Sequence, residues 1–234
     1  LSFDDNSLVL VSVSDWLMER AKQSPMLSRF RNITIFNGID TNVFKYYNTN
    51  DIRSRYTHSG EKMVLYVTAG FFPEIDDNKG GKFVVNLANR LLKENQRIRI
   101  VVAANHSSFS KKLPQNITFI GSVNNQQELA LLYSSADITL ITSKRETFSM
   151  PVAESLCCGT PILGFESGGP ESVALPKYSC FVKYGDEQKL YESMQRMFSM
   201  KCDKYQISLD SANVYSRKAM TDQYIDCYSQ LEGR

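Results

Sequence analysis

The stretch SKRETFSMPVAESLCCGTPILGF, residues 143–165, has the signals of a loop, a helix and a strand in succession. Ser149 is a typical N-cap residue, and Pro151 suits the first helical turn, where its missing N–H costs no hydrogen bond. Gly159 and Pro161 are typical of the end of a helix, and the apolar residues that follow predict a short buried strand.

Two carboxylates flank the predicted start of this helix, because Glu146 and Glu154 lie eight positions apart. A helix N-terminus presents free amides and the positive end of the helix dipole, and both favour a bound phosphate. Carboxylates beside it can accept hydrogen bonds from hydroxyl groups. The pair therefore suits a ligand with both sugar hydroxyls and phosphate, and a nucleotide sugar is such a ligand.

Apolar runs of strand length alternate with helical patterns from residue 63 onward. The predicted strands are 63–68, 97–104, 116–121, 137–143, 161–165 and 179–184, and the predicted helices include 81–95, 126–136 and 186–200. Buried strands that alternate with helices favour a parallel sheet covered on both faces. We therefore predict an α/β fold, a Rossmann-like parallel sheet with helices on both faces, whose ligand binds beyond the carboxyl ends of the strands.

The pattern divides the chain into four parts. Residues 1–40 predict a strand, a helix that Asp15 could cap, and a second strand, all preceding the main array. Residues 41–62 are polar and aromatic without a strong period, which predicts a linker with a short helix. Residues 63–205 hold the main array, and residues 206–234 predict C-terminal helices.

Composition excludes several classes of function. A net charge of +2 is too small to favour a nucleic-acid partner, and 42% hydrophobic residues exclude global disorder. No apolar run approaches the roughly 20 residues of a membrane span. The five cysteines include no C-x-x-C pair, and His58 and His106 stand alone, so we expect neither zinc nor disulfides. Reduced thiols are typical of a cytoplasmic protein.

Five motifs occur in an order and spacing that resemble the retaining glycosyltransferases of the GT-B fold, family 4. They are NGIDTNVF (37–44), NKGG (78–81), FIGSV (119–123), ETFSMPVAESLCCGTPIL (146–163) and SGGPESV (167–173). The resemblance extends over about residues 8–200. It implies that residues 63–205 are the C-terminal, nucleotide-sugar-binding domain of a GT-B enzyme. Residues 1–40 would then be the last strand–helix–strand of its N-terminal domain.

The resemblance implies catalytic roles for Glu146 and Lys79. Glu146 would face the donor hexose and position its hydroxyls, and Lys79 would meet the diphosphate. Glu154 would hold the ribose hydroxyls of the donor. On these roles we expect Glu146→Ala and Lys79→Ala to lower turnover strongly in an intact enzyme, and Glu154→Ala mainly to weaken donor binding.

The resemblance also implies substrate-binding residues that contact the diphosphate through their main chain or lie beside the nucleotide base. The backbone amides of Phe148, Ser149 and Met150 would bind the diphosphate. Gly121 and Val123 would lie by the nucleotide base.

Two departures from the family pattern concern the phosphate site. The family usually has an Arg shortly before the Lys, whereas TAGFFPEIDDNKGG (68–81) has none, so one phosphate-binding cation is unassigned. Lys144 or Arg145 could compensate. The usual glycines around the loop Phe are replaced by Thr147 and Ser149, which keep their backbone amides, so we expect the site to survive.

The resemblance implies a retaining hexosyltransferase that transfers a sugar from a UDP- or GDP-sugar to a glycan or lipid-linked acceptor, in polysaccharide or glycolipid assembly. No metal or other cofactor is expected, since no Asp-x-Asp motif is present. Most of the acceptor-binding N-terminal domain is missing, so the fragment is expected to bind the donor without transferring sugar. Any peripheral membrane contact, at the cytoplasmic face, is expected in that missing domain.

Two other functions stay open from the sequence: a non-catalytic nucleotide-binding module, and a nucleotide-sugar epimerase of GT-B fold. Two readings of Glu171 also stay open, as an acid at the start of a helix or as a ligand-binding residue. Cys157 and Cys158 are interpreted as small core residues. The linker tyrosines, including Tyr47 and Tyr56, are expected to cover the seam between domains.

Overall fold

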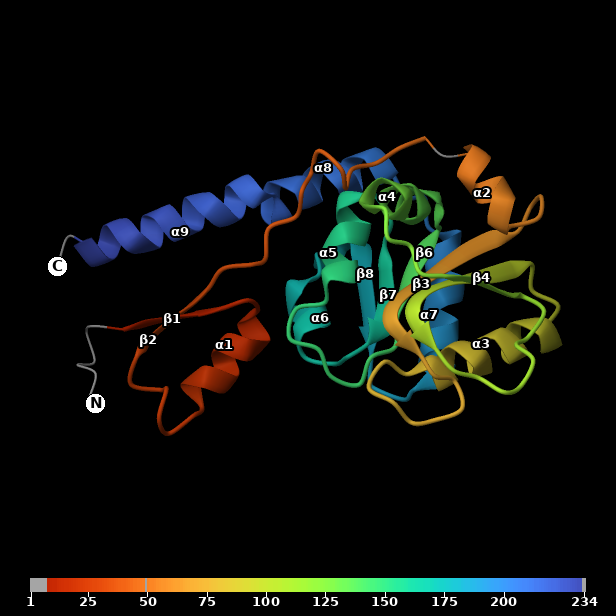
Figure 1. Cartoon of the computed structure of the whole chain (residues 1–234), viewed down its shortest axis with the longest axis horizontal. Coiled ribbons are helices and arrows are strands. Elements are labelled where there is room, and N and C mark those ends of the chain that lie inside the picture. The colour runs from red at the N-terminus through yellow and green to blue at the C-terminus, as the bar shows by residue number, and fades with distance from the viewer. Residues whose placement is uncertain (1–7, 49, 233–234) are drawn as a thin grey trace.

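The computed structural model describes residues 8–48 and 50–232, and its centre is a six-stranded parallel sheet (Figure 1). The strand order is β5-β4-β3-β6-β7-β8, and every neighbouring pair is parallel. This is the doubly wound order in which the chain moves outward from β3 in one direction and then from β6 in the other. The strands are β3 (Lys62–Phe71), β4 (Ile98–Ser107), β5 (Ile117–Gly121), β6 (Ile138–Ile141), β7 (Ile162–Phe165) and β8 (Ser179–Val182).

Helices cover both faces of this sheet, as predicted. Successive residues of β3 belong to different hydrophobic clusters, Met63 and Leu65 to one and Val64 and Tyr66 to the other, because side chains alternate along a strand. The cluster of Val64 is covered by α3 (Gly81–Lys93) and α7 (Glu187–Ser199). The cluster of Leu65 is covered by α4 (Gln126–Ser135), α5 (Met150–Cys157) and α8 (Lys204–Tyr215).

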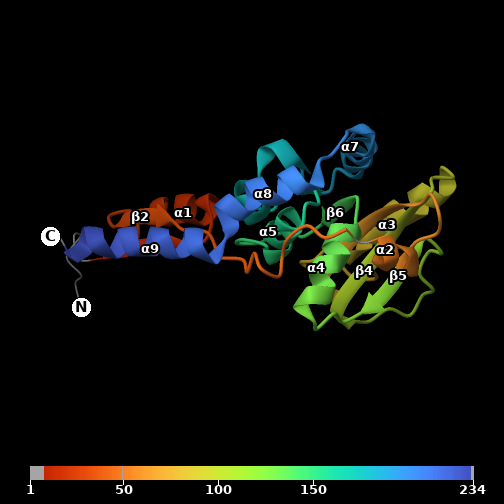
Figure 2. The same ribbon diagram turned by 90° about the horizontal axis from the view of Figure 1, so that it is seen from above.

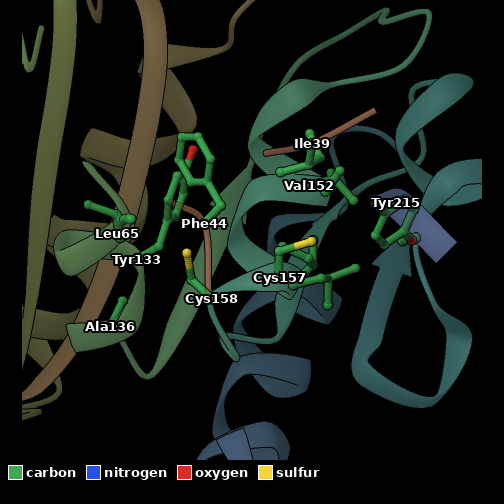
Figure 3. Packing of buried hydrophobic residues seen from close by; sticks show 14 of the residues in the cluster. Ile39, Phe44, Leu65, Tyr133, Ala136, Val152, Cys157, Cys158 and Tyr215 are labelled. Atoms are coloured by element: carbon green, nitrogen blue, oxygen red, sulfur yellow. The ribbon is translucent and has the colours of Figure 1, made fainter. Parts of the chain in front are cut away.

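The cluster of Leu65 includes the two cysteines that were predicted to lie in the core (Figure 3). Cys157 and Cys158 are fully buried among residues of α4, α5 and α8, including Tyr133 and Tyr215. All five cysteines are free, as expected from their spacing. The prediction that Cys157 and Cys158 fill the core is therefore confirmed.

Helix α3 begins where the sheet requires a glycine. Gly80 precedes it with φ +74°, and a Cβ atom there would lie 2.2 Å from the carbonyl oxygen of Thr142. No other residue type fits so close to the chain that leaves β6. This contact fixes the position of the preceding residue, Lys79, between the ends of β3 and β6.

The N-terminal residues form a separate layer. β1 (Val9–Ser12) and β2 (Arg31–Thr34) make a two-stranded parallel sheet beside α1 (Asp15–Lys22). The expected cap Asp15 is wrong by one residue: Ser14 is the N-cap, and its hydroxyl accepts a hydrogen bond from the N–H of Leu17 at 3.2 Å. Asp15 instead occupies the first turn, where its charge suits the helix dipole.

The C-terminal helix α9 (Arg217–Glu232) leaves α8 and lies along this N-terminal layer (Figures 1 and 2). Arg31 of β2 donates a hydrogen bond to the side chain of Gln230 at 2.5 Å, and the N–H of Gly38 contacts the sulfur of Met220 at 3.2 Å. The N-terminal layer and α9 are therefore in contact. None of the helices in the described residues is long and apolar enough to span a membrane.

The predicted linker contains α2 (Asn50–Tyr56), and it packs against the main sheet. Arg53 donates hydrogen bonds to the carbonyl of Ser135 at 2.8 Å and to the carboxylate of Asp137 at 2.6 Å. Tyr47 and Tyr56 are partly buried against the cluster on this face. These tyrosines therefore cover core residues of the main domain.

Candidate functional site

A cleft of about 480 Å³ opens where the strand order reverses, at the carboxyl ends of β3 and β6. Its walls come from both strands, from the loop after β6, and from the beginning of α5. Ligands of doubly wound sheets bind in the crevice at this switch point. The predicted site residues that line it are Lys79, Val123, Glu146, Phe148, Ser149, Met150 and Glu154.

Gly121 is the one predicted site residue that is not among the lining residues. It ends β5 with φ +73°, and a Cβ atom there would meet nothing within 4 Å. The positive φ favours a glycine at this position, and packing places no further restriction on it. Its role beside a nucleotide base stays a prediction.

Glu146 is the best-anchored side chain of the cleft. Its Oε1 atom accepts hydrogen bonds from Lys79 Nζ at 2.5 Å and from Ser143 Oγ at 2.9 Å. Within the described residues its Oε2 atom has no partner. The carboxylate is therefore oriented by one oxygen, and its other oxygen is available to a ligand.

The main chain of Glu146 is held as firmly as its side chain. Its N–H donates to the carbonyl of Ser167 at 3.0 Å, and its carbonyl accepts from the N–H of Gly169 at 2.9 Å. Glu171 braces the same turn by accepting from the N–H groups of Ser167 and Gly168, at 2.9 and 2.7 Å. The open alternative for Glu171 is thus resolved in favour of the helix-start acid, at the N-terminus of α6 (Gly169–Val173).

Lys79 is fixed through its backbone. Its carbonyl accepts hydrogen bonds from the hydroxyls of Tyr66 at 2.7 Å and Thr142 at 2.8 Å, and its N–H donates to Asp77 at 3.2 Å. Among the described residues that line the cleft, Lys79 is the only Lys or Arg. The ammonium group of Lys79 is therefore the one positively charged side chain that the cleft offers to an anion.

The start of α5 differs from its prediction in one respect. Ser149 occupies the N-cap position, but its hydroxyl caps no amide, because its backbone is left-handed with φ +70° and ψ +87°. Pro151 does lie in the first turn, as predicted. The N–H groups of Phe148, Ser149 and Met150 have no acceptor within the described residues. These three amides are therefore free for a bound anion.

Glu154 lies one helical turn beyond Met150 and lines the same cleft. Its Oε2 atom accepts a hydrogen bond from the hydroxyl of Tyr133 at 3.1 Å, and Tyr133 is completely buried. Burial raises the pKa of the Glu154 carboxyl, and the Tyr133 hydrogen bond partly opposes that rise. As in Glu146, one oxygen is held by the protein and the other has no described partner.

Neither Lys144 nor Arg145 lines the described cleft, so a compensating role for either one stays a prediction. Both side chains are exposed. Their backbones hold the preceding loop instead: Lys144 N–H donates to the Asn78 carbonyl at 2.8 Å, and the Asn78 side chain donates to the Arg145 carbonyl at 2.9 Å.

Three contacting residues were not predicted from the sequence. Ser143 and Tyr66 orient Glu146 and Lys79, and Tyr133 orients Glu154. Ser143 had a usable signal, because it is a polar residue directly after a buried strand. Tyr133 had none, since its hydroxyl reaches Glu154 only through the packing of α4 against α5. In the described part of the chain no three His, Cys, Asp or Glu side chains gather as a metal site would require.

Comparison with known proteins agrees with this geometry. Residues 48–213 match the family of group 1 glycosyl transferases. An uncharacterized glycosyltransferase of Methanocaldococcus jannaschii is 27% identical over 148 residues, which is 58% of this chain and 36% of that protein. A GDP-mannose-dependent alpha-mannosyltransferase of Corynebacterium glutamicum is 25% identical over 119 residues, which is 51% of this chain and 27% of that protein.

The fold is also that of a solved relative. The structure of HepE from Anabaena in complex with UDP superimposes with a TM-score of 0.76 at 15% identity, covering 95% of this chain and 64% of that one. The chain spans 36% of the length of the first of these curated relatives and 27% of the length of the second. Because the family match extends over most of the chain, this chain belongs to the group 1 glycosyltransferases.

Proposed function

We propose that the cleft binds a nucleotide-sugar donor and that the chain is the donor-binding part of a retaining hexosyltransferase of family 4. One observation carries this proposal: Lys79, the unpaired amides at the start of α5, and the carboxylates of Glu146 and Glu154 line one cleft. Each of the two carboxylates has one oxygen without a described hydrogen-bond partner. A nucleoside diphosphate sugar has an anionic centre between two hydroxyl-bearing rings. In the chain the amides of residues 148–150 come between Glu146 and Glu154, and Lys79 contacts Glu146.

The proposed chemistry is electrostatic. Departure of the nucleoside diphosphate builds negative charge, which Lys79 and the amides of Phe148, Ser149 and Met150 would stabilise without a metal ion. The hexose develops oxocarbenium character, and Glu146 would hold its hydroxyls through the free Oε2 atom. Glu154 would accept hydrogen bonds from the ribose.

The donor is proposed to be a UDP- or GDP-sugar. HepE was solved with UDP and with UDP-glucose, and the Corynebacterium relative is a GDP-mannose-dependent enzyme. The acceptor is proposed to be a glycan or a lipid-linked sugar in polysaccharide or glycolipid assembly, met in the cytoplasm at the membrane face. No contact in the described chain favours the alternatives of an epimerase or a non-catalytic module.

Calorimetry with the 234-residue chain tests donor binding. UDP, GDP, ADP, UDP-glucose and GDP-mannose are titrated in turn, and we expect one of the uridine or guanosine pairs to bind. Lys79→Met and Glu154→Ala should both weaken that binding. Absence of binding by all five compounds, or binding that neither substitution changes, would contradict the proposal.

The raised pKa of Glu154 predicts a pH dependence of donor binding. The ionised carboxylate is the better acceptor for ribose hydroxyls, so affinity should fall as pH is lowered toward 4.5, the ordinary value for a glutamate. The diphosphate of UDP-glucose stays ionised throughout this range and adds no titration of its own. Affinities measured upward from pH 4.5 should therefore rise and then level off.

Glu154→Gln is the matched control for this titration, because glutamine cannot ionise. Its affinity for UDP-glucose should be lower than that of the wild type at neutral pH and nearly constant over the same range. A variant that keeps the wild-type pH profile would show that another group is responsible.

A further inference from the structure

The indole of Trp16, in the N-terminal layer, lies directly on Gly168 of the turn before α6. A Cβ atom at Gly168 would lie 2.5 Å from Trp16 Cε2 and 2.8 Å from Cδ2, so the ring touches the glycine backbone. Gly168 has φ +106°, a conformation that favours glycine. The contact therefore depends on the absence of a side chain on one partner and on a large flat ring on the other.

Trp16 is held in this position by its own surroundings. Its helix α1 is capped by the buried Ser14. The backbone N–H of Trp16 donates a hydrogen bond to Ser172 Oγ at 3.4 Å, and Ser172 Oγ donates to the carbonyl of Gly169 at 2.9 Å. The guanidinium of Arg20 lies 5.1 Å from the centre of the indole ring. The indole is partly buried and joins α1 to the turn before α6.

The same turn holds Glu146. The two hydrogen bonds of the Glu146 main chain go to Ser167 and Gly169, the neighbours of Gly168 on either side. A Cβ atom at Gly169 would lie 2.2 Å from the carbonyl oxygen of Thr147, so the turn and the Glu146 loop are in direct backbone contact. A shift of this turn must therefore move the main chain of Glu146.

Two of the other predicted binding residues, Lys79 and Glu154, have contacts of their own outside this turn. Lys79 is fixed by Tyr66 and Thr142 at the ends of β3 and β6. Glu154 is oriented by Tyr133 of α4. Loss of the Trp16 contact should therefore disturb the hexose end of the cleft more than the ribose end.

We propose that Trp16 is a positioning residue for Glu146, acting through the turn 167–169, and that the N-terminal layer thereby controls recognition of the donor hexose. This inference rests on the proposed role of Glu146. It gives the β1–α1–β2 segment a specific task in donor recognition, although that segment contributes no side chain to Glu146 itself.

The test measures the ratio of two affinities, for UDP-glucose and for UDP, with GDP-mannose and GDP in parallel. In Trp16→Ala this ratio should fall about 10-fold relative to the wild type, because roughly one hydrogen bond to a charged group is lost. The affinity for the nucleotide alone should stay unchanged. Trp16→Phe keeps a flat ring over Gly168 and should retain most of the ratio. Arg20→Ala is the matched control, since it removes the other ring contact without touching the turn.

The outcomes separate the two proposals. If the wild type binds none of the four compounds, the proposed function fails. If the wild type binds but Trp16→Ala keeps the wild-type ratio, the positioning role is wrong. An equal loss for nucleotide and nucleotide sugar would also overturn it, because that pattern indicates a purely structural role.

A second measurement uses the wild type alone, so it does not depend on whether a variant folds. Trp16 is the only tryptophan of the chain, so emission excited at wavelengths that tyrosine does not absorb reports on this residue alone. In the wild type, the nucleotide sugar should change the tryptophan emission more than the matching nucleotide does. Identical emission changes for the two ligands, at saturation of each, would contradict coupling between the hexose and Trp16.

Discussion

Replacing Lys79 by methionine should lower the affinity for UDP-glucose or GDP-mannose, whichever the wild type binds, by about 100-fold. The cleft presents no other cationic side chain in the described residues, and a hydrogen bond between charged groups contributes roughly 1.5–3 kcal/mol. Methionine keeps much of the length and apolar stem of lysine, so the change is mainly one of charge. The measurement is calorimetric affinity at low and at physiological ionic strength.

Lys144→Met is the matched control for this prediction. It removes the same charge from an exposed side chain of the neighbouring loop that does not line the cleft, so its affinity should stay within about twofold of the wild type. If Lys144→Met or Arg145→Met weakens binding as much as Lys79→Met, then one of these residues supplies the cation that the family arginine usually provides. Equal affinities of Lys79→Met and the wild type would remove Lys79 from the site.

Replacing Glu146 by glutamine should reduce glycosyl transfer by about 100- to 1000-fold, the range found when one preorganised electrostatic group is lost from an active site. Glutamine keeps the shape of the side chain but removes the charge that pairs with Lys79 and that we propose faces the sugar. The rate is measured as nucleotide release in the presence of acceptor, in a form of the enzyme that turns over its donor.

The same Glu146→Gln variant should not lose affinity for UDP or GDP. Lys79 donates to Glu146 in the ligand-free chain, so removal of the carboxylate charge frees the ammonium group for phosphate. Glu166→Gln is the control, because Glu166 is an exposed carboxylate on the loop after β7 and outside the cleft. A parallel loss of rate and nucleotide affinity in Glu146→Gln would mean that Glu146 shapes the whole cleft instead of the hexose end.

The sheet could be predicted from the sequence because its central strands are buried on both faces. Runs such as residues 63–68 and 137–143 are almost continuously apolar, and they occupy β3 and β6 at the centre of the sheet. Strand ends were less predictable, since β8 ends at Val182, two residues before the predicted end at 184. Pairing depends on neighbours that are distant in the chain.

The candidate site was predictable where function imposes a local pattern, and unpredictable where packing supplies the contact. Glu146 and Glu154 stand at a fixed spacing in one loop and helix, so the sequence already places them together. The partners Tyr133 and Trp16 reach the site across long stretches of chain and have no local signal. The left-handed backbone of Ser149 was also missed, because a serine at this position ordinarily predicts a side-chain cap.

The ion pair between Lys79 and Glu146 joins the proposed phosphate-binding cation directly to the proposed sugar-binding carboxylate. We expect a bound diphosphate to compete with this carboxylate for the ammonium group, and that competition would subtract from the affinity that the diphosphate could otherwise reach. A free hexose has no anion to offer Lys79. We therefore expect UDP or GDP alone to weaken the ion pair and free glucose or mannose to leave it intact.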